Sequence, residues 1–508
     1  MPGIPDIALG ADELLYVTEE TTFGVWARPV AGDAVRVREI GFTRSQERVT
    51  RDDKLATRSH TERITRKKSV EWNVTAYLVP SGIDPSVTAT PPDAGVLLKA
   101  LFGAETVNAG VDVQYTLVRN QNISLTLHRI CDHFAESLTG CVPNEATISW
   151  SGTDEPTLEL TGFGKEWVIT ASHITGEAAT ITGTTLKIPR ADDVCDVNSV
   201  VAFISGGTQY DNSGNGYHIS AVTAGGWPSP VINSGVNDQI DFDEGSGTLS
   251  AILTADTYVS FTQLANEIKT RMELVGSDTY TVTWDADTEK ITISSDGTSL
   301  DIDWATGTNT AGPTLGFTAD DTGALSYTAD ESLTTGEITT DESGGWEAAF
   351  VSGAEIIPFF PAPTVQGSPE NSILGGVQID GSLDLNTTEG SIEYNGNMEA
   401  RNDIFGEESA IGFSVSGRRE VSATMTAYLQ EQYAREVKDF NRFQNQHNVV
   451  VTFGSTAGQI MEVHLPEFEF DNVPFTVPEQ EEATVDFTGM ALDTSGPPFE
   501  NEIYIVFK

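Results

Sequence analysis

VEWNVTAYL, residues Val70–Leu78, and VSATMTAYL, residues Val421–Leu429, are two versions of one nine-residue stretch. Both alternate between apolar and polar side chains with period two, which predicts a β-strand with one face against a core. A basic pair precedes each version at the same distance, Lys67–Lys68 and Arg418–Arg419. The residues we expect in the two cores are Val70, Trp72, Val74, Leu78, Val421, Met425 and Leu429.

The segments after each version also follow a common order. In the first copy we expect a helix in Pro91–Gly103, short strands at Val113–Val118 and Ile123–His128, and a closing strand, PTLELTG, at Pro156–Gly162. In the second we expect a helix in Glu431–Phe443, strands at Asn448–Phe453 and Ile460–Leu465, and a closing strand, ATVDFTG, at Ala483–Gly489. This order predicts an internal duplication. The alternative is a chance recurrence of ordinary β composition.

The composition predicts a mainly β chain of the α+β class, because 508 residues include 47 glycines and abundant threonine. We expect two β-barrel or sandwich halves, each with a flanking helix, separated by an insertion with no counterpart in the second copy. The expected domains are a first half with an N-terminal arm (1–167), a small β-rich domain in two pieces (168–236 and 336–362), a nested α+β domain (237–335) and a second half (363–508).

The nested α+β domain gives the clearest local signals. A helix is predicted over Phe261–Val275, because Ser260 precedes it and Gln263 follows Ser260 at capping-box spacing. A hairpin is predicted after it, with a turn at Asp285–Lys290.

Acidic residues dominate the chain and are unevenly distributed. The formal net charge is −47, and the span Asp238–Glu342 alone has 21 acidic and 3 basic residues. Such a charge argues against binding of phosphate backbones, which require clustered lysine and arginine. A solvated surface that maintains solubility and an adaptation to a saline environment both explain the excess.

One segment has the opposite charge. Arg36–Lys68 contains 11 basic and 5 acidic residues, whereas the matching span Thr387–Arg419 contains 3 basic and 6 acidic residues. Three interpretations remain open: contact between identical stacked molecules through complementary charges, a solvated loop, and nucleic-acid binding. The candidates for contact between stacked rings are Arg48, Arg51, Arg58, Arg63, Arg66, Lys67 and Lys68.

No residue pattern nominates a catalytic or metal site. The sequence has no P-loop, no GxGxxG after a strand and no GxSxG elbow. The histidine–cysteine group His128, Cys131, His133 and Cys141 is expected to belong to a core strand, because alternate residues of a strand point in opposite directions. Asp285 and Asp287 lack the glycine and the closing glutamate of a calcium loop. We therefore expect no enzyme activity, no metal and no cofactor.

The chain also shows no export or membrane signal. Its N-terminus has no basic start followed by an apolar run, and no stretch approaches 18 consecutive apolar residues. We expect synthesis in the cytoplasm and no membrane insertion.

Three stretches resemble the major tail tube protein of long-tailed, siphovirus-type phages. They are YVTEETTFGVWARP (Tyr16–Pro29), RKKSVEWNVTAYLVP (Arg66–Pro80) and HLPEFEFDNVPFTVPEQEEATVDFTGMAL (His464–Leu492). The resemblance covers about residues 1–167 and 366–508 and indicates a variety with two fused tube-fold copies and an inserted exterior domain.

The resemblance implies a structural role in the virion tail after assembly in the host cytoplasm. Single-copy members form hexameric rings that stack into a tube, so a two-copy chain would form a trimeric, pseudo-hexameric ring. The implied partners are further copies of the chain, the tape measure protein, the tail terminator and tail-tip proteins, while viral DNA passes through during ejection without specific binding. Two alternatives are a tail-tip or fibre adhesin whose insertion binds a host glycan, and a secreted β-type hydrolase.

Overall fold

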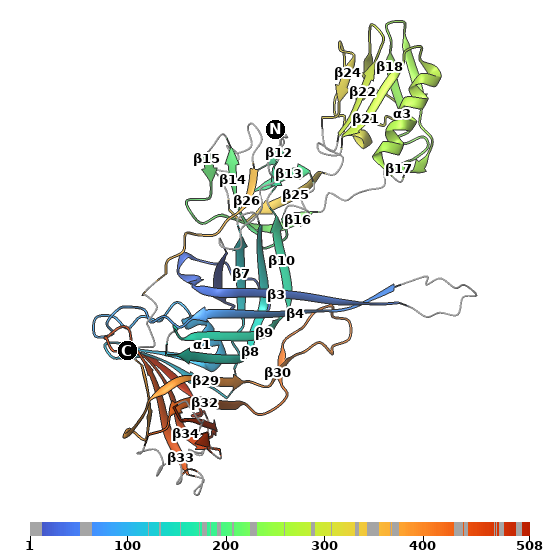
Figure 1. The fold of residues 1–508 in the computed structure, drawn as a ribbon. Coiled ribbons are helices and arrows are strands. Elements are labelled where there is room, and N and C mark those ends of the chain that lie inside the picture. Colours follow the sequence, from blue (N-terminus) through green and yellow to red (C-terminus); the bar gives the residue numbers. More distant parts are fainter. Residues whose placement is uncertain are drawn as a thin grey trace, which may run out of the picture. The chain divides into compact units, whose positions relative to one another are not determined.

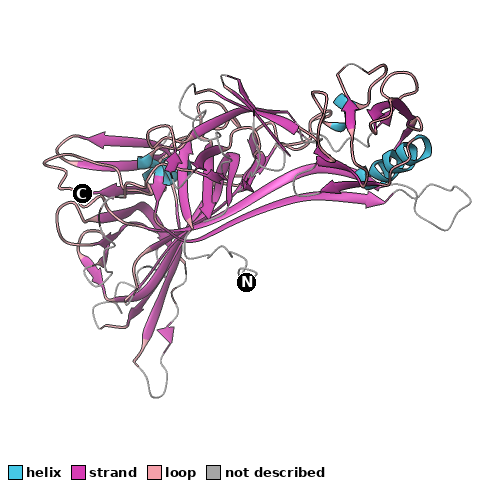
Figure 2. Cartoon of the chain, turned by 90° about the horizontal axis from the view of Figure 1, so that it is seen from above, coloured by secondary structure: helices cyan, strands magenta, loops and turns pink. Residues whose placement is uncertain are grey.

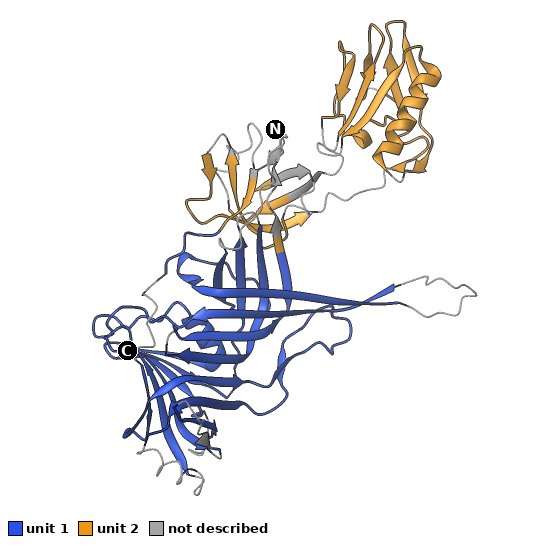
Figure 3. Cartoon of the chain, viewed as in Figure 1, with its two compact units in different colours: residues 1–168, 360–508 blue, residues 169–359 orange. Residues whose placement is uncertain are grey.

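The protein comprises two compact units in the computed structural model (Figure 3). Unit 1 contains Met1–Val168 and Phe360–Lys508, and unit 2 contains Ile169–Phe359. The structure describes the whole chain except residues 1–12, 51–62, 120, 132–133, 153, 172, 175–179, 183, 190–194, 206–207, 224–230, 259, 286–289, 306, 331–334, 343–354, 366, 368–374, 431–439, 441–444, 472, 474, 477–481 and 494–499.

The first copy of the repeat is an antiparallel sheet with the spatial order β2-β1-β7-β8-β9-β4-β3 (Figure 1). The expected N-terminal arm is part of it, since β1 pairs with β2 and β7. The bounds are β1 Leu14–Glu19, β2 Ala34–Val35, β3 Val37–Thr50, β4 Arg63–Tyr77, β7 Leu125–Cys131, β8 Phe134–Ser151, β9 Thr157–Gly164 and β10 Glu166–Ala171.

The second copy repeats this order as β28-β27-β33-β34-β36-β32-β29. The last strand of each copy also has a matching partner, because β10 pairs with β8 and β37 pairs with β34. Eight strands of one copy therefore have counterparts in the other. The bounds are β27 Gly376–Ile379, β28 Leu383–Leu385, β29 Thr387–Asn395, β32 Glu420–Tyr428, β33 Gln446–Phe453, β34 Met461–Phe470, β35 Phe475–Thr476, β36 Thr484–Ala491 and β37 Tyr504–Phe507.

The two copies share one hydrophobic core, because their alternating strands turn their apolar faces toward the same cluster. The predicted core residues lie there: Val70, Trp72, Val74, Leu78, Val421 and Met425 are buried, and Leu429 is partly buried against the same cluster. Helix α1, Gly95–Phe102, covers this core with Leu97, Leu98 and Leu101, which confirms the helix predicted in the first copy. It ends at Gly103, whose φ of 97° favours glycine.

The predicted match between the strands after the helix is wrong. The segment at Val113–Val118 corresponds to β6, Asp112–Leu117, which forms a hairpin with β5, Gly103–Asn108, and also pairs with β37. Within the part of the chain that the structure describes, this hairpin has no counterpart in the second copy. The counterparts of β33 and β34 are β7 and β8, so the sequence comparison was shifted by one strand. The helix predicted at Glu431–Phe443 lies outside the described residues except for Phe440, which is buried against Phe470.

Unit 2 contains one larger sheet and a nested α+β fold. The larger sheet has the order β11-β26-β14-β16-β25-β13-β12, with β15 paired to β14. Its bounds are β11 His173–Ile174, β12 Thr180–Thr182, β13 Thr185–Pro189, β14 Val200–Ser205, β15 Thr208–Tyr210, β16 Tyr217–Thr223, β25 Thr335–Thr340 and β26 Glu355–Pro358.

The nested fold has its own core around helix α3, Phe261–Val275. The Ser260 side chain accepts a hydrogen bond from the Gln263 backbone at 3.1 Å, which confirms the predicted helix start. The predicted hairpin is confirmed as well, since β21 pairs with β22. The bounds are β17 Val231–Ile232, β18 Gln239–Asp243, β19 Thr248–Ile252, β20 Asp256–Thr257, β21 Tyr280–Asp285, β22 Lys290–Ser295, β23 Asp301–Asp303 and β24 Ser326–Thr328.

Candidate functional site

The two copies are joined edge to edge into one continuous layer of strands. Strand β8 pairs with β9 of its own copy on one edge and with β29 of the other copy on the opposite edge. The pairing with β29 runs from Ser151↔Glu389 to Glu145↔Asn395. The layer therefore has the order β3-β4-β9-β8-β29-β32-β36-β35. We call it the junction sheet.

One face of the junction sheet covers the core, and the opposite face is polar and acidic. Paired residues point to the same side of a sheet, so the registers identify which side chains share this polar face. Between Glu39 and Ser45 on β3, between Ser69 and Tyr77 on β4 and on the other strands, the alternating positions of this face contain no lysine or arginine. Eight carboxylates on it are exposed: Glu39, Glu71, Glu145, Glu159, Glu389, Glu393, Glu420 and Asp486.

Neutral side chains between these carboxylates hold some of them in place. The Asn395 amide donates to Glu145 at 3.3 Å across the junction between the copies, and the Thr426 hydroxyl donates to Asp486 at 2.9 Å. A surface of this kind repels a phosphate backbone, because binding DNA requires basic groups to replace its counterions. The sequence prediction did not identify these residues; period-two alternation marks each one as facing away from the core, but only strand pairing brings them onto one face.

The basic segment predicted to contact other molecules forms a long hairpin of β3 and β4 (Figure 2). Arg48 and Arg63 lie exposed on its described part. Arg66 is also exposed and forms an ion pair of 2.7 Å with Glu47 of the same hairpin. Arg51 and Arg58 lie outside the described residues.

The two predicted basic pairs occupy equivalent places and contact the chain itself. Lys68 forms an ion pair of 2.9 Å with Glu408, and its partner Lys67 donates to the Ile404 carbonyl. In the second copy Arg419 forms an ion pair of 3.2 Å with Glu502. The hydrogen bond from Lys68 lowers the pKa of Glu408. Lys67 and Lys68 therefore hold the base of the hairpin against the 401–412 segment of the second copy.

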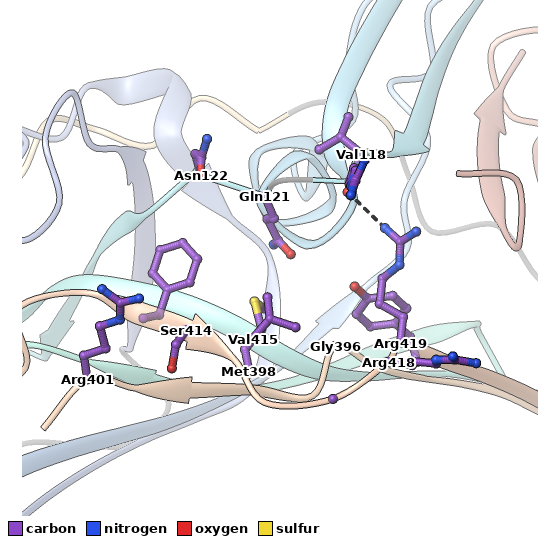
Figure 4. A pocket seen from close by; sticks show the side chains of 14 residues that line it. Val118, Gln121, Asn122, Gly396, Met398, Arg401, Ser414, Val415, Arg418 and Arg419 are labelled. Carbon is purple, nitrogen blue, oxygen red and sulfur yellow. Dashed lines mark hydrogen bonds between the residues drawn. The ribbon is translucent and has the colours of Figure 1, made fainter. Parts of the chain in front are cut away.

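A hollow of about 790 Å³ lies beside the second basic pair (Figure 4). Arg119, Arg401 and Arg418 line it and are exposed, while Arg419 donates to the Val118 carbonyl at 2.9 Å. The residues lining the hollow do not combine a nucleophile with a general base, so it offers no catalytic arrangement.

Three members of the histidine–cysteine group of the sequence, His128, Cys131 and Cys141, are packed into the first copy. His128 is buried, its Nε2–H donates to the Ala27 carbonyl at 2.9 Å, and its Nδ1 accepts from Ser137 at 2.8 Å. Burial lowers the pKa of His128 to about 3. Cys131 and Cys141 donate to Glu13 and to the Leu138 carbonyl, and His133 lies outside the described residues. Among the described residues, no three histidine, cysteine or acidic side chains gather as metal ligands.

In the described part of the chain, no helix is both long and apolar enough to cross a bilayer.

Comparison with known proteins identifies a family for this chain. A search of curated proteins found no match. The family model described as "Phage tail tube protein" matches residues 10–279, which is more than half of the chain and includes the whole first copy. The match continues through the start of unit 2 and ends just beyond α3. The chain therefore belongs to the phage tail tube protein family, and it is a structural component of the virion tail.

Proposed function

We propose that this chain is the tube subunit of a siphovirus-type tail, that it has two fused tube folds, and that three chains close a pseudo-hexameric ring. The observation that carries the proposal is the pairing of β8 with β29, by which one copy joins the next within a single polypeptide. Two matching units joined head to tail form a heterologous contact. Repeating such a contact closes a ring when the rotation between units divides a full turn.

The polar face of the junction sheet is proposed to line the bore. Its eight exposed carboxylates would repel DNA along the whole passage, so the genome would slide without being held. The role is structural and not enzymatic. Viral DNA would pass through during ejection, and the bore would first enclose the tape measure protein.

The β3–β4 hairpin is proposed to contact the neighbouring ring in the stack, because its exposed Arg48 and Arg63 can face acidic surfaces of an otherwise acidic molecule. Unit 2 is proposed as an exterior decoration, divided into the β-rich and nested α+β domains predicted from sequence. The tail terminator and tail-tip proteins would bind the two ends of the stack. Assembly would take place in the host cytoplasm.

Electron microscopy of the purified full-length chain tests the ring. Negative-stain images should show rings or stacked tubes, and native mass spectrometry should show an assembly of three chains of 54.6 kDa each. A chain that stays monomeric at high concentration and at every salt concentration would refute the proposal.

The stacking contact has its own test. Arg48→Glu together with Arg63→Glu should leave the rings intact and abolish stacking, because the charge at the contact reverses. Arg66→Glu is a matched control on the same hairpin, where Glu47 already partners the arginine. Tubes of normal length from the double variant would show that these charges do not hold the rings together.

A further inference from the structure

Strands in the middle of the junction sheet pair with a neighbour on each side, whereas the strands at its two ends, β3 and β35, pair on one side among the described residues. In the middle, β8 and β29 cover each other. The strand equivalent to β29 in the first copy is β3, and within the described residues it pairs only with β4. The strand equivalent to the second half of β8 is β35, which pairs only with β36 among the described residues. Each end of the sheet therefore presents one half of a junction that the chain has already built in its middle.

The equivalence between β3 and β29 is fixed to the single residue by matching irregularities. The register of β3 with β4 shifts between Val37 and Glu39, opposite Ala76. The register of β29 with β32 shifts in the same way between Thr387 and Glu389, opposite Ala427. One extra residue at the same place in both copies means that Gly41 and Phe42 occupy the positions of Ser391 and Ile392.

The equivalence between β8 and β35 is fixed in the same manner. In the first copy, Pro143 pairs with Gly162 and Ile148 pairs with Leu158. Between these two pairs the chain advances by five residues on β8 but by only four on β9. In the second copy, Gly489 faces Phe470 and Val485 faces Phe475, which again gives five steps against four. Phe475 and Thr476 therefore occupy the positions of Ile148 and Ser149.

We propose that β3 of one protomer pairs antiparallel with β35 of the next protomer, in the register that β29 keeps with β8. Within the chain Ile392 faces Ile148 and Ser391 faces Ser149. Between chains Phe42 therefore faces Phe475, and Gly41 faces Thr476. This interface rests on the proposed ring, and it names the strands and the register that close it.

The chemistry of the two edges fits a second copy of this chain. Phe42 lies on the core side of β3 and is only partly buried, whereas Ile392, its counterpart in the covered strand, is 1% exposed. A strand laid beside β3 would complete the burial of Phe42, and it would pair the backbone groups on the side of β3 away from β4 and on the side of β35 away from β36. Exposed edges otherwise invite uncontrolled pairing, which a closed ring removes. The two edges are different strands of one protomer, so the contact continues from chain to chain.

Disulfide crosslinking of the full-length chain tests the register. Gly41→Cys combined with Thr476→Cys should give covalent dimers and trimers on a non-reducing gel after mild oxidation, and reductant should reverse them. A cysteine at position 41 displaces only the amide end of the Asn73 side chain. The native thiols of Cys131, Cys141 and Cys195 are buried, and burial raises the pKa of Cys131 to about 11 and that of Cys195 to about 12, so they oxidise slowly.

Two matched pairs control this experiment. Ser149→Cys with Ser391→Cys places thiols at the equivalent pair inside the chain and should form an intrachain disulfide in comparable yield. Thr43→Cys with Thr476→Cys shifts the proposed register by two residues, which places the Cα atoms about 7–8 Å apart, beyond ordinary disulfide geometry. We expect the 41–476 pair to crosslink about tenfold more than the 43–476 pair.

The outcomes separate the interface from the ring. Rings in the microscope together with efficient 41–476 crosslinking support the register. Rings with no 41–476 crosslink, or with preferred 43–476 crosslinking, overturn this interface and leave the tube proposal standing. Absence of rings for the unmodified chain overturns the tube proposal, and the interface with it.

Discussion

The strands of the two copies occupy equivalent positions in the sheet, but the segments that connect these strands differ. β3 has 14 residues and extends with β4 into a basic hairpin, whereas its counterpart β29 has 9. In the second copy the equivalent connection forms a small hairpin of β30, Met398–Ala400, and β31, Phe413–Val415. The shared core constrains the positions of the strands but not the segments that connect them. Differences between the copies therefore accumulate in the connecting segments.

The same comparison separates residues that maintain the fold from residues free for assembly. β4 and β32 turn the same alternating positions into the core and have the same neighbours in the sheet. The edges of β3 and β29 differ, because among the described residues β29 pairs with both β32 and β8, whereas β3 pairs only with β4. The predictions below test these equivalences, beginning with the largest expected effect.

Met425→Asp should break the core shared by the two copies. Met425 is fully buried in β32, at the place of Val74 in β4. An uncompensated carboxylate there should lower the free energy of unfolding by about 3–5 kcal/mol. Urea denaturation followed by tryptophan fluorescence measures the change. Thr424→Asp, at the neighbouring exposed position, is the control and should change stability little; equal losses for both variants would contradict the assigned faces.

Gly390→Ile should show that the copies are not interchangeable at their junction. In the first copy the equivalent residue is Ile40, but a Cβ at position 390 would overlap the Trp150 ring, which also packs edge-on against Phe453 at 5.8 Å. Overpacking of this kind costs about 1–3 kcal/mol. Thermal denaturation measures it, with Ile40→Val as the control on the equivalent strand. Unchanged stability of the Gly390 variant would mean that Trp150 does not fill this space.

His128→Val should alter the pH dependence of folding, because the equivalent residue of the second copy is Val450. The folded pKa of His128 is lowered to about 3, so between about pH 6.5 and 4.5 the unfolded state binds a proton that the folded state does not. The wild type should therefore lose stability as pH falls through this window, by up to about 1.4 kcal/mol per pH unit.

The His128→Val variant should lose the part of the pH dependence of the free energy of unfolding that His128 contributes, whatever the absolute stability of the variant. Urea titrations between pH 7 and 4.5 measure it. Leu127→Val, a core change on the same strand, should destabilise the fold and retain the wild-type slope. If the free energy of unfolding changed equally with pH in all three proteins, His128 would not be the cause of the pH dependence.

Arg419→Ala should cost more than Lys68→Ala, although the two residues occupy equivalent places. Arg419 pairs with Glu502, which is much less exposed than Glu408, and also donates to the Val118 carbonyl, so its removal should cost about 1–2 kcal/mol. Lys68 pairs with the exposed Glu408, and its removal should be undetectable in 0.5 M salt, where such pairs are screened. Urea midpoints at low and high salt compare them. A larger loss of stability for Lys68→Ala than for Arg419→Ala would contradict this prediction.

Short-range patterns predicted much of this fold correctly. The alternation in Val70–Leu78 and Val421–Leu429 and the cap at Ser260 gave β4, β32 and α3, because a strand's face and a helix's start depend on neighbouring residues. Beyond the strand the prediction failed in one respect: β6 was matched to β33 and β7 to β34, whereas the observed pairings match β7 to β33 and β8 to β34. Short apolar runs resemble one another, and only their pairing partners distinguish them.

The acidic polar face likewise depends on both local alternation and strand pairing. Each of its carboxylates follows from local alternation, yet Glu145, Glu393 and Asp486 come together only because β8, β29, β32 and β36 pair in a definite order. Likewise, the charge excess of the hairpin was evident in the sequence, but the contacts of Lys67 and Lys68 with the 401–412 segment were not.

The sequence by itself determined that this protein is built from two like β units around an apolar core, with a strongly acidic surface and one basic segment. Tertiary structure alone decided that β8 of the first copy pairs with β29 of the second and that β3 and β35 form the two ends of the sheet in the described part of the chain. The physical reason is that alternation along a strand fixes which face is buried, whereas the choice of neighbouring edge depends on backbone groups that every residue carries.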